Sequence, residues 1–411
     1  MAIIKPFSAL RPQPDVAAQL ASRPYDVLNS EEARKEAAGN PVSFLHITKS
    51  EIDLPAEVDI HSTAVYAKAK ENLQQFIDDG LLTKEEKPCY YIYQLVMPLP
   101  QGGQHSQTGL VCVSSVDDYN NDVIKKHEYT RPEKEKDRID HMQAIAAQTG
   151  NVFLAYRDVM EVNALIEGWK ATNKPVYDFA APDGIQHTIW VIDREIVVNS
   201  ITRLFETNVP CTYIADGHHR AASAAKVRNA FPESEDAKYF LTTIFPESQL
   251  SIWDYNRVVK DLNELKPENL LGFLQEDFYI TLSPEPVKPA QPHEFGLYLD
   301  NQWYILVARE GTYTTDPIGV LDISILSKNV LEKLLGIKDQ RTDKRIDFVG
   351  GIRGLAELEN RVNSGEMAAA FSLYPVSLSQ LFDIADSGNV MPPKSTWFEP
   401  KLRDGLLTHL L

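Results

Sequence analysis

The stretch Cys211-Thr-Tyr-Ile-Ala-Asp-Gly-His-His-Arg220, followed by the alanine-rich run 221–228, carries the strongest local signal in the chain. Its apolar, β-type first half predicts a strand that ends at Asp216, and the alanine-rich run predicts a helix. Gly217 allows the chain to bend between the two. A helix start presents unpaired backbone N–H groups and the positive end of the helix dipole, and both attract phosphate. The stretch therefore predicts a strand–turn–helix unit that binds an anion.

Four side chains of this turn add chemistry to the helix start. Arg220 can hold a phosphate group through two parallel hydrogen bonds. His218 and His219 supply hydrogen-bond donors or a general base, and Asp216 supplies a carboxylate. In the simpler alternative, Asp216 only caps the helix and the histidines only satisfy local hydrogen bonds. Two adjacent histidines between an aspartate and an arginine exceed what a plain turn needs, so we favour a functional site.

Composition limits the classes of protein to which the chain can belong. It has 411 residues, of which 43% are hydrophobic and 24% charged, and no apolar run approaches the ~18 residues of a membrane helix. Three scattered cysteines, Cys89, Cys112 and Cys211, fit reduced thiols in the cytoplasm better than disulfides or a zinc ribbon. A formal net charge of −17 disfavours nucleic acid as a partner and suits a small anionic ligand. The oligomeric state stays open, a homodimer included.

Strand-like and helix-like segments alternate along the chain, which predicts a mixed α/β or α+β fold. Expected helices lie at 61–79, 116–127, 133–149, 159–170, 194–206, 267–277, 322–335, 353–364 and 377–386. Expected strands lie at 90–97, 110–114, 152–156, 187–193, 238–245, 254–259, 345–349 and 368–374, with a hairpin loop at 98–106 and a hairpin at 295–308. The pattern of expected helices and strands changes near residue 260. We therefore expect an N-terminal lobe over 1–259 and a C-terminal α+β lobe over 260–411, whose segment 390–401 could return to the site.

Lys125-Lys-His-Glu-Tyr-Thr130, with the charged run that follows it, is a second candidate cluster. It lies at a predicted helix end, where cations commonly complement the helix dipole and mixed charge is usually a solvated face. His127-Glu128 lacks the second histidine four residues on that a zinc-protease helix requires. The chain also contains neither a Gly-x-x-x-x-Gly-Lys-Ser/Thr loop nor a Gly-x-Gly-x-x-Gly loop.

Two further segments combine polar residues with prolines. In Arg23-Pro-Tyr-Asp-Val-Leu-Asn-Ser30, Asn29 or Ser30 should cap a helix that begins at Glu31. That cap leaves Tyr25-Asp26 unexplained. Met391-Pro-Pro-Lys-Ser-Thr-Trp-Phe-Glu-Pro-Lys401 is a polar loop with two lysines and two hydroxyls, a composition that either binds anions or has no function.

Five motifs in fixed order resemble a widespread bacterial and archaeal family of uncharacterised proteins that carries the name SpoOJ/ParA/ParB/RepB family. The motifs are Pro24-Tyr-Asp-Val-Leu28, Lys126-His-Glu-Tyr-Thr130 with Lys136-Asp-Arg138, Asp216-Gly-His-His-Arg220, Tyr255-Asn-Arg257 and Met391-Pro-Pro-Lys-Ser-Thr396. The resemblance runs from Lys5 to Lys401 and so covers nearly the whole chain.

The family name points to a superfamily of ParB N-terminal domains, sulfiredoxin and free-serine kinases. The resemblance implies a ParB/sulfiredoxin-like nucleotide-binding core with large additional α+β elements. It also implies that Gly217, His219 and Arg220 bind phosphate, while Asp216 or His218 lies near the reacting groups. Sulfiredoxin needs a cysteine in this turn, where the chain has histidine. ParB clamp proteins carry a DNA-binding helix-turn-helix motif and a basic net charge, and this chain shows neither clearly.

The preferred interpretation is a cytoplasmic nucleotide-dependent phosphotransferase acting on a small polar metabolite such as serine. The catalytic candidates are Asp216, His218 and Glu128. The phosphate and nucleotide candidates are Gly217, His219, Arg220, Lys126, Thr130 and Arg138. The substrate or loop candidates are Tyr25, Asp26, Asn256, Arg257, Lys394, Ser395, Thr396 and Lys401.

The nucleotide would be ATP, ADP or CTP with Mg²⁺, which nucleotide phosphates and one or two carboxylates would hold. Two alternatives stay open. One is a nucleotide-binding regulatory protein of the ParB type without net phosphorylation. The other is a metal-dependent hydrolase that uses His127, Glu128, Asp216, His218 and His219.

Overall fold

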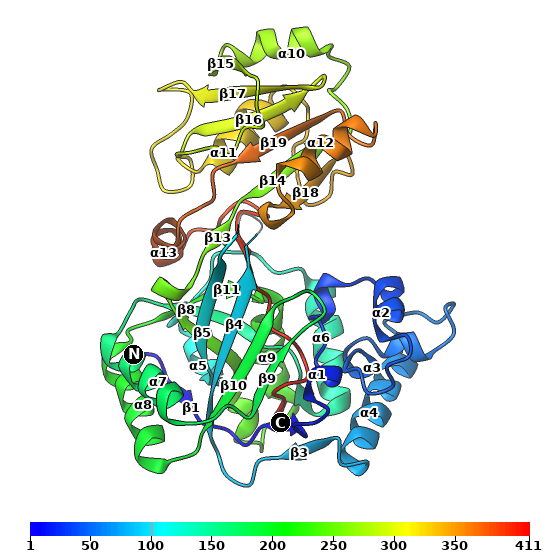
Figure 1. The fold of residues 1–411 in the computed structure, drawn as a ribbon, viewed down its shortest axis with the longest axis vertical. Coiled ribbons are helices and arrows are strands. Elements are labelled where there is room, and N and C mark those ends of the chain that lie inside the picture. Colours follow the sequence, from blue (N-terminus) through cyan, green and yellow to red (C-terminus); the bar gives the residue numbers. More distant parts are fainter. Residues whose placement is uncertain (100–101) are drawn as a thin grey trace. The chain divides into compact units, whose positions relative to one another are not determined.

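The computed structural model describes residues 1–99 and 102–411, which form two compact units (Figure 1). Unit 1 comprises Met1–Leu250 and Pro400–Leu411, and unit 2 comprises Ser251–Glu399. Strands and helices alternate in both, so the predicted mixed α/β fold is confirmed. Strand β14 (Tyr255–Val259), which we assigned to the first lobe, pairs with strands of unit 2.

Unit 1 is built on a nine-stranded mixed sheet in the order β6-β11-β8-β12-β5-β4-β10-β9, with β1 paired to β5. Its strands are β1 (Ile4–Lys5), β4 (Tyr90–Pro98), β5 (Gln104–Ser115), β6 (Ile124–Lys125), β8 (Val152–Tyr156), β9 (Tyr177–Ala180), β10 (Gln186–Ile192), β11 (Thr212–Asp216) and β12 (Tyr239–Pro246). The pairs β6–β11 and β8–β12 are parallel, and the other pairs are antiparallel.

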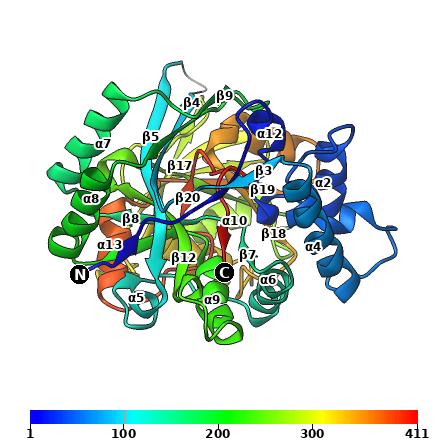
Figure 2. The same cartoon turned by 90° about the horizontal axis from the view of Figure 1, so that it is seen from below.

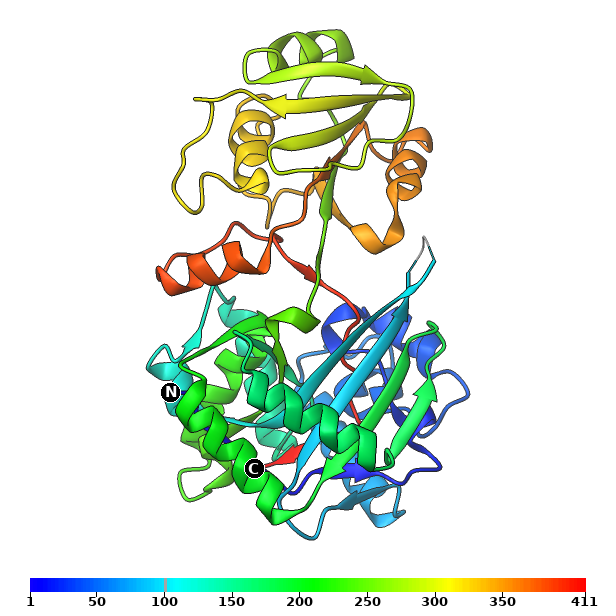
Figure 3. The same ribbon diagram turned by 60° about the vertical axis from the view of Figure 1, so that its left-hand side comes forward.

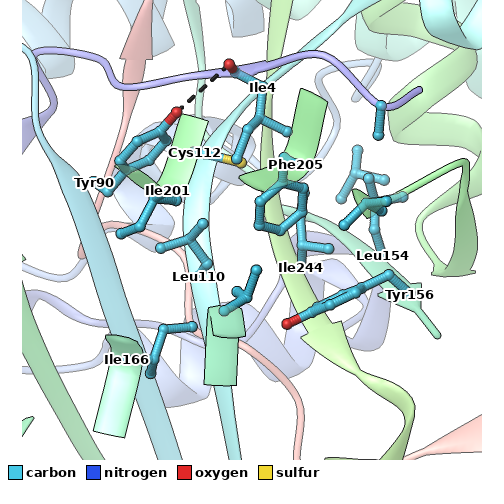
Figure 4. Packing of buried hydrophobic residues seen from close by; sticks show 14 of the residues in the cluster. Ile4, Tyr90, Leu110, Cys112, Leu154, Tyr156, Ile166, Ile201, Phe205 and Ile244 are labelled. Carbon is cyan, nitrogen blue, oxygen red and sulfur yellow. Dashed lines mark hydrogen bonds between the residues drawn. The ribbon is translucent and has the colours of Figure 1, made fainter. Parts of the chain in front are cut away.

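One face of this sheet packs against α7 (Met160–Thr172), α8 (Glu195–Asn208) and α9 (His218–Val227). Figure 4 shows the resulting core, in which Phe205 of α8 lies near Tyr156 of β8, with ring centroids 5.4 Å apart. On the other face, Tyr91 of β4 accepts the Ala9 N–H at 3.1 Å, and the Tyr93 hydroxyl accepts the Arg403 N–H at 3.3 Å. Tyr90 and Ile92, which alternate with these two tyrosines, belong to the core on the first face, as the pleat requires.

A further group of helices in unit 1 comprises α1 (Ala17–Leu20), α2 (Ser30–Ala37), α3 (Leu45–Thr48), α4 (Thr63–Asp78) and α6 (Pro132–Ile145) (Figure 1). Figure 2 shows α2, α4 and α6 of this group from below. Helix α4 buries Val65, Ala69, Leu73 and Phe76, which the 3.6-residue period places on one face. The chain leaves the helix through Gly80, whose φ is +70°. Asn29 caps α2 in a reciprocal arrangement with Glu32, so this predicted cap is confirmed.

Unit 2 contains a six-stranded antiparallel sheet in the order β15-β17-β16-β19-β14-β18 (Figure 3). Its other strands are β15 (Phe278–Ser283), β16 (Glu294–Leu299), β17 (Gln302–Ala308), β18 (Ile346–Gly350) and β19 (Ala369–Leu373), with β13 (Ile252–Trp253) paired to β20 (Trp397–Phe398). Its helices are α10 (Pro267–Leu274), α11 (Asp322–Leu326), α12 (Leu355–Asn363) and α13 (Leu378–Asp386), and a π-helical turn, Ser327–Glu332, continues α11.

Several predicted bounds are wrong. The helix expected at 116–127 is only α5 (Val116–Asn120), because Asp122 adopts a φ of +56° and Ile124–Lys125 pairs with β11. The helix expected at 133–149 ends at Ile145, before Ala146 with a φ of +50°.

The remaining short strands are β2 (Leu10–Pro12), which pairs with β3 (Leu82–Lys84), and β7 (Ala147–Gln148), which pairs with β21 (His409–Leu410). The predicted hairpin loop at 98–106 falls partly on residues 100–101, outside the described residues. Within the described chain, no helix combines the length and the apolar character needed to cross a membrane.

Candidate functional site

The turn predicted from the sequence lies between β11 and α9 in unit 1. Gly217 occupies the N-cap position of α9 with φ +94° and ψ +32°, a left-handed conformation that favours glycine. The N-cap residue is Gly217 and not Asp216, and it has no side chain to cap the helix, so the capping role considered for Asp216 is wrong. The start of α9 therefore keeps the backbone N–H groups that an anion would use.

Arg220 lies beneath the turn and is surrounded by acceptors. Its Nη2 atom lies 3.3 Å from an oxygen of Asp26 and 3.6 Å from an oxygen of Asp216, and Nη1 donates to the carbonyl of Asn151. The residue is only 8% exposed, and its Nε atom has no hydrogen-bond partner among the described residues. The guanidinium thus supplies positive charge from below the turn, with Asp26 and Asn151 occupying its two ends.

Asp216 lies between two cations at the end of β11. Its carboxylate accepts a hydrogen bond from Lys401 Nζ at 3.0 Å, and Arg220 approaches the same oxygen. Burial alone would raise the pKa of Asp216, but Lys401 and Arg220 outweigh it and hold the pKa well below its usual range. Asp216 is therefore ionised at neutral pH and is a weak proton acceptor.

The two histidines of the turn accept hydrogen bonds from the loop 126–131. His218 Nε2 accepts the His127 N–H at 3.4 Å, and His219 Nε2 accepts the Arg131 N–H at 3.0 Å. Burial and the neighbouring His127 lower the pKa of His218, and burial and Lys134 lower that of His219. Both imidazoles are thus assigned as neutral, with their proton on Nδ1.

The loop 126–131 is joined to α9 and α6 by further polar contacts. Thr130 donates to Glu135, and Glu135 pairs with Lys226 of α9. Glu128 is 45% exposed, and its carboxylate lies 3.7 Å from His218 Nδ1. Lys126 is directed elsewhere, because its ammonium bonds Asp122 at 2.7 Å and the Tyr119 carbonyl at 2.8 Å.

Tyr25 and Arg138 form a second layer beside Arg220. The Arg138 guanidinium lies 3.9 Å from the centre of the Tyr25 ring and donates to Asp137 at 2.8 Å. Burial would raise the pKa of Asp137, but Arg138 and the hydrogen bonds of this cluster lower it to about 2. A cavity of about 30 Å³ is lined by Tyr25, Arg138, His141, Gln148, Gly150 and Arg220. It has room for about one water molecule.

The unit 2 candidates form a cluster of their own. Asn256 bonds Asp254 at 2.6 Å, and Arg257 Nη2 donates to the Lys394 carbonyl at 2.7 Å. Ser395 donates to the Pro392 carbonyl at 2.6 Å, and Thr396 follows it in the same loop. Within this unit, Arg257 therefore fixes the loop 391–397 to β14.

The structure adds four residues that sequence reasoning missed. They are Asn151, Gly150, Glu135 and Asp404, each within or next to the polar network around α9. Their contacts join segments far apart in the sequence, so local pattern gives no sign of them. Among the described residues, no three histidine, cysteine, aspartate or glutamate side chains converge as metal ligands would, including the five proposed for a metal hydrolase.

Comparison with solved structures gives distant similarities. A free serine kinase in complex with AMP is 13% identical, with a TM-score of 0.35, over 74% of this chain and 89% of that one. A conserved hypothetical protein from Pyrococcus furiosus is 13% identical, with a TM-score of 0.37, over 76% and 97%. SbnI from Staphylococcus aureus, truncated at its C-terminus, is 12% identical, with a TM-score of 0.33, over 73% and 87%.

No protein of curated function matches the chain. One family model, described as a protein of unknown function (DUF1015), matches residues 4–324, which is more than three quarters of the chain. The chain therefore belongs to the DUF1015 family.

Proposed function

We propose that this protein is a nucleotide-dependent phosphotransferase whose acceptor is a small hydroxyl-bearing metabolite. The observation that supports it most is the start of α9, where Gly217 leaves the helix without a side-chain cap. Cations and a carboxylate surround that start, because Arg220 lies below it and Lys401 bonds Asp216 beside it. Phosphoryl transfer depends on positioning and on positive groups that stabilise charge on the phosphates, and this turn offers both.

In this proposal the phosphates bind the backbone N–H groups at the start of α9. His219 is partly exposed, and its Nδ1–H is the side-chain donor best placed to join them. Lys401 adds positive charge beside the turn, while the buried Arg220 adds it from beneath. Mg²⁺ would be held mainly by the phosphates, with Asp216 or Glu128 as the carboxylates at hand.

Glu128 is the best candidate to accept the proton of the acceptor hydroxyl. Asp216 is held ionised by two cations, and a carboxylate with so low a pKa removes protons poorly. The Nε2 lone pair of His218 already accepts the His127 N–H. The side chain of Glu128 is 45% exposed and its carboxylate lies 3.7 Å from His218 Nδ1, at the edge of the same turn.

An activity assay tests this proposal directly. The protein is incubated with MgATP or MgADP and single hydroxyl-bearing metabolites, and phosphorylated products are sought by ³¹P NMR. Serine is the first acceptor to test, because the turn resembles that of free-serine kinases. Glu128→Gln should lower the rate at least about 100-fold, since general-base catalysis contributes about 10²–10⁴-fold.

The matched control is Glu133→Gln, which removes an exposed carboxylate from the first turn of α6. It should leave the rate unchanged. Nucleotide binding without any phosphorylated product would contradict the phosphotransferase and would favour the ParB-type regulatory protein. Full activity of Glu128→Gln would contradict the role of Glu128 alone.

A further inference from the structure

Asp404 brings a buried carboxyl group close to Arg220. It belongs to the C-terminal segment of unit 1, is 2% exposed, and pairs with Ser22 through backbone hydrogen bonds of 3.0 and 3.1 Å. A Cβ atom placed on Gly150 would lie 3.2 Å from Arg220 Cδ and 3.7 Å from Asp404 Oδ1. The missing side chain of Gly150 is therefore what lets both residues pack at this point.

The carboxyl group is only partly satisfied. The Tyr25 backbone hydrogen-bonds it, but Oδ2 has no hydrogen-bond partner among the described residues. A buried carboxylate with an unpaired oxygen is costly unless a cation compensates it. The residues that act on it electrostatically are Arg220 of α9, Asp26 and Tyr25 of the 3₁₀ turn Tyr25–Val27, Arg138 of α6 and Tyr93 of β4.

Charges around Arg220 do not balance. Among the described residues, the three carboxylates Asp26, Asp216 and Asp404 gather around Arg220, and Lys401 is a second cation bonded to Asp216. Arg138 has its own partner in Asp137. Burial, reinforced by Asp26, raises the pKa of Asp404 to about 7, even though Arg220 favours its ionised form. An anion that approaches Arg220 would add a further negative charge to this group.

We propose that Asp404 is a positioning residue that couples anion binding at the start of α9 to the uptake of one proton. A phosphate group bound near Arg220 adds negative charge, so the positive charge of Arg220 no longer compensates the Asp404 carboxylate. The carboxylate then takes a proton from solvent and becomes a neutral carboxylic acid. This inference rests on the proposed function, because it assumes that an anion binds at this turn.

Linkage makes the coupling measurable. If binding takes up a proton at Asp404, affinity must fall as pH rises above the pKa of Asp404, by up to about tenfold per pH unit. His218 and His219 are neutral above pH 7 in the free protein, so proton uptake by either would give the same slope, and the Asp404→Asn variant is what distinguishes Asp404 from them. Asp404→Asn keeps the shape and an acceptor for Tyr25 but cannot take up the proton.

The experiment measures dissociation constants by calorimetry from about pH 7.5 to 9, where the ADP phosphates, with a last pKa of about 6, are fully ionised. The probes are ADP and sulfate, which carries no nucleoside. The control is Asp322→Asn in unit 2, since Asp322 is also buried, accepts one backbone N–H, and has its pKa raised to about 7 by burial. Wild type and Asp322→Asn should lose up to about tenfold in affinity per pH unit, and Asp404→Asn less than about twofold.

The outcomes separate this inference from the proposed function. An equal slope in wild type and Asp404→Asn overturns the inference and leaves nucleotide binding intact. Binding of sulfate but not ADP, with a slope that Asp404→Asn removes, supports the inference and contradicts the nucleotide. Absence of binding by either probe overturns both. Melting curves confirm that each variant is folded.

Discussion

The backbone N–H of Arg131 donates to His219 Nε2 at 3.0 Å, which fastens the loop 126–131 to the first turn of α9. His218 makes the equivalent contact with His127. Two motifs that are separate in the sequence are thereby held together, and the histidine lone pairs are used for structure. The Nδ1–H of His219 remains for a ligand, whereas the Nδ1 of His218 lies 3.7 Å from the Glu128 carboxylate.

His219→Ala should loosen this loop. It removes the acceptor for the Arg131 N–H, and a hydrogen bond of this kind contributes about 1 kcal/mol. Hydrogen exchange in the peptide that contains Arg131 should therefore become about fivefold faster. His61→Ala is the matched control, because His61 bonds Asp137 and not the loop. Unchanged hydrogen exchange at Arg131 in His219→Ala would show that His219 does not hold the loop 126–131 against α9.

Asp404→Asn should stabilise unit 1 at high pH. The folded-state pKa of Asp404 is about 7, above its ordinary 3.8, so the carboxylate destabilises the fold once it ionises. The gain should be absent below about pH 4, grow between pH 4 and 7, and reach on the order of 2–4 kcal/mol above pH 7. Melting curves of both proteins across this range measure it, and a gain that does not change with pH would contradict the assignment.

Asp216→Asn should destabilise the fold, whereas Asp404→Asn should stabilise it. The pKa of Asp216 is depressed in the folded state by Lys401 and Arg220, so the carboxylate stabilises the fold at neutral pH. We expect a loss of about 1–2 kcal/mol at pH 7, discounted because the side chain is 32% exposed. The loss should shrink only below about pH 4. A variant as stable as wild type at pH 7 would contradict the paired arrangement.

Gly217→Ala should separate backbone strain from ligand binding. A left-handed conformation costs a residue with a side chain about 1–2 kcal/mol, and the new Cβ would lie 3.2 Å from Arg220 Nε. Gly39→Ala carries a similar φ of +75° with no atom within 4 Å of its Cβ. Both variants should lose stability by urea unfolding, Gly217→Ala somewhat more because of this contact, but only Gly217→Ala should lose ADP affinity, by about tenfold or more. Equal affinity in the two would contradict the role of the turn.

The core of unit 1 should depend strongly on Phe205. Its side chain is fully buried against Tyr156, so Phe205→Ala should cost about 3–5 kcal/mol. Ile196 lies on the same helix but is 72% exposed, and Ile196→Ala should cost less than about 0.5 kcal/mol. Urea unfolding followed by circular dichroism measures both, and similar losses would show that α8 does not pack as described.

Local signals in the sequence predicted local structure well. The spacing of Val65, Ala69 and Leu73 identified α4, and Asn29 was recognised as a cap. The turn at Gly217 was predicted because strand and helix patterns meet there. Each of these signals depends on neighbours within a few residues.

Contacts between distant segments could not be predicted in this way. The extent of the helix from Val116 was wrong because pairing of Ile124–Lys125 with β11 overrides a helical pattern. Asp216, for which a capping role was only the alternative to a functional one, accepts a hydrogen bond from Lys401, a residue 185 positions away in the sequence. The sequence around Asp404 gave no sign of a functional role, because its interaction with Arg220 arises only where the C-terminal segment meets α9.

The most direct test of the central claim is the thermal stabilisation of the protein by ATP, ADP and CTP with Mg²⁺, measured beside His219→Ala and His61→Ala. A nucleotide at 100 times its Kd should add about 2.7 kcal/mol to the stability of the folded protein. The account predicts that at least one nucleotide raises the melting temperature of wild type and His61→Ala, and that His219→Ala loses most of the shift. Stabilisation by none of them, or an equal shift in His219→Ala, would contradict a nucleotide-phosphate site at the start of α9.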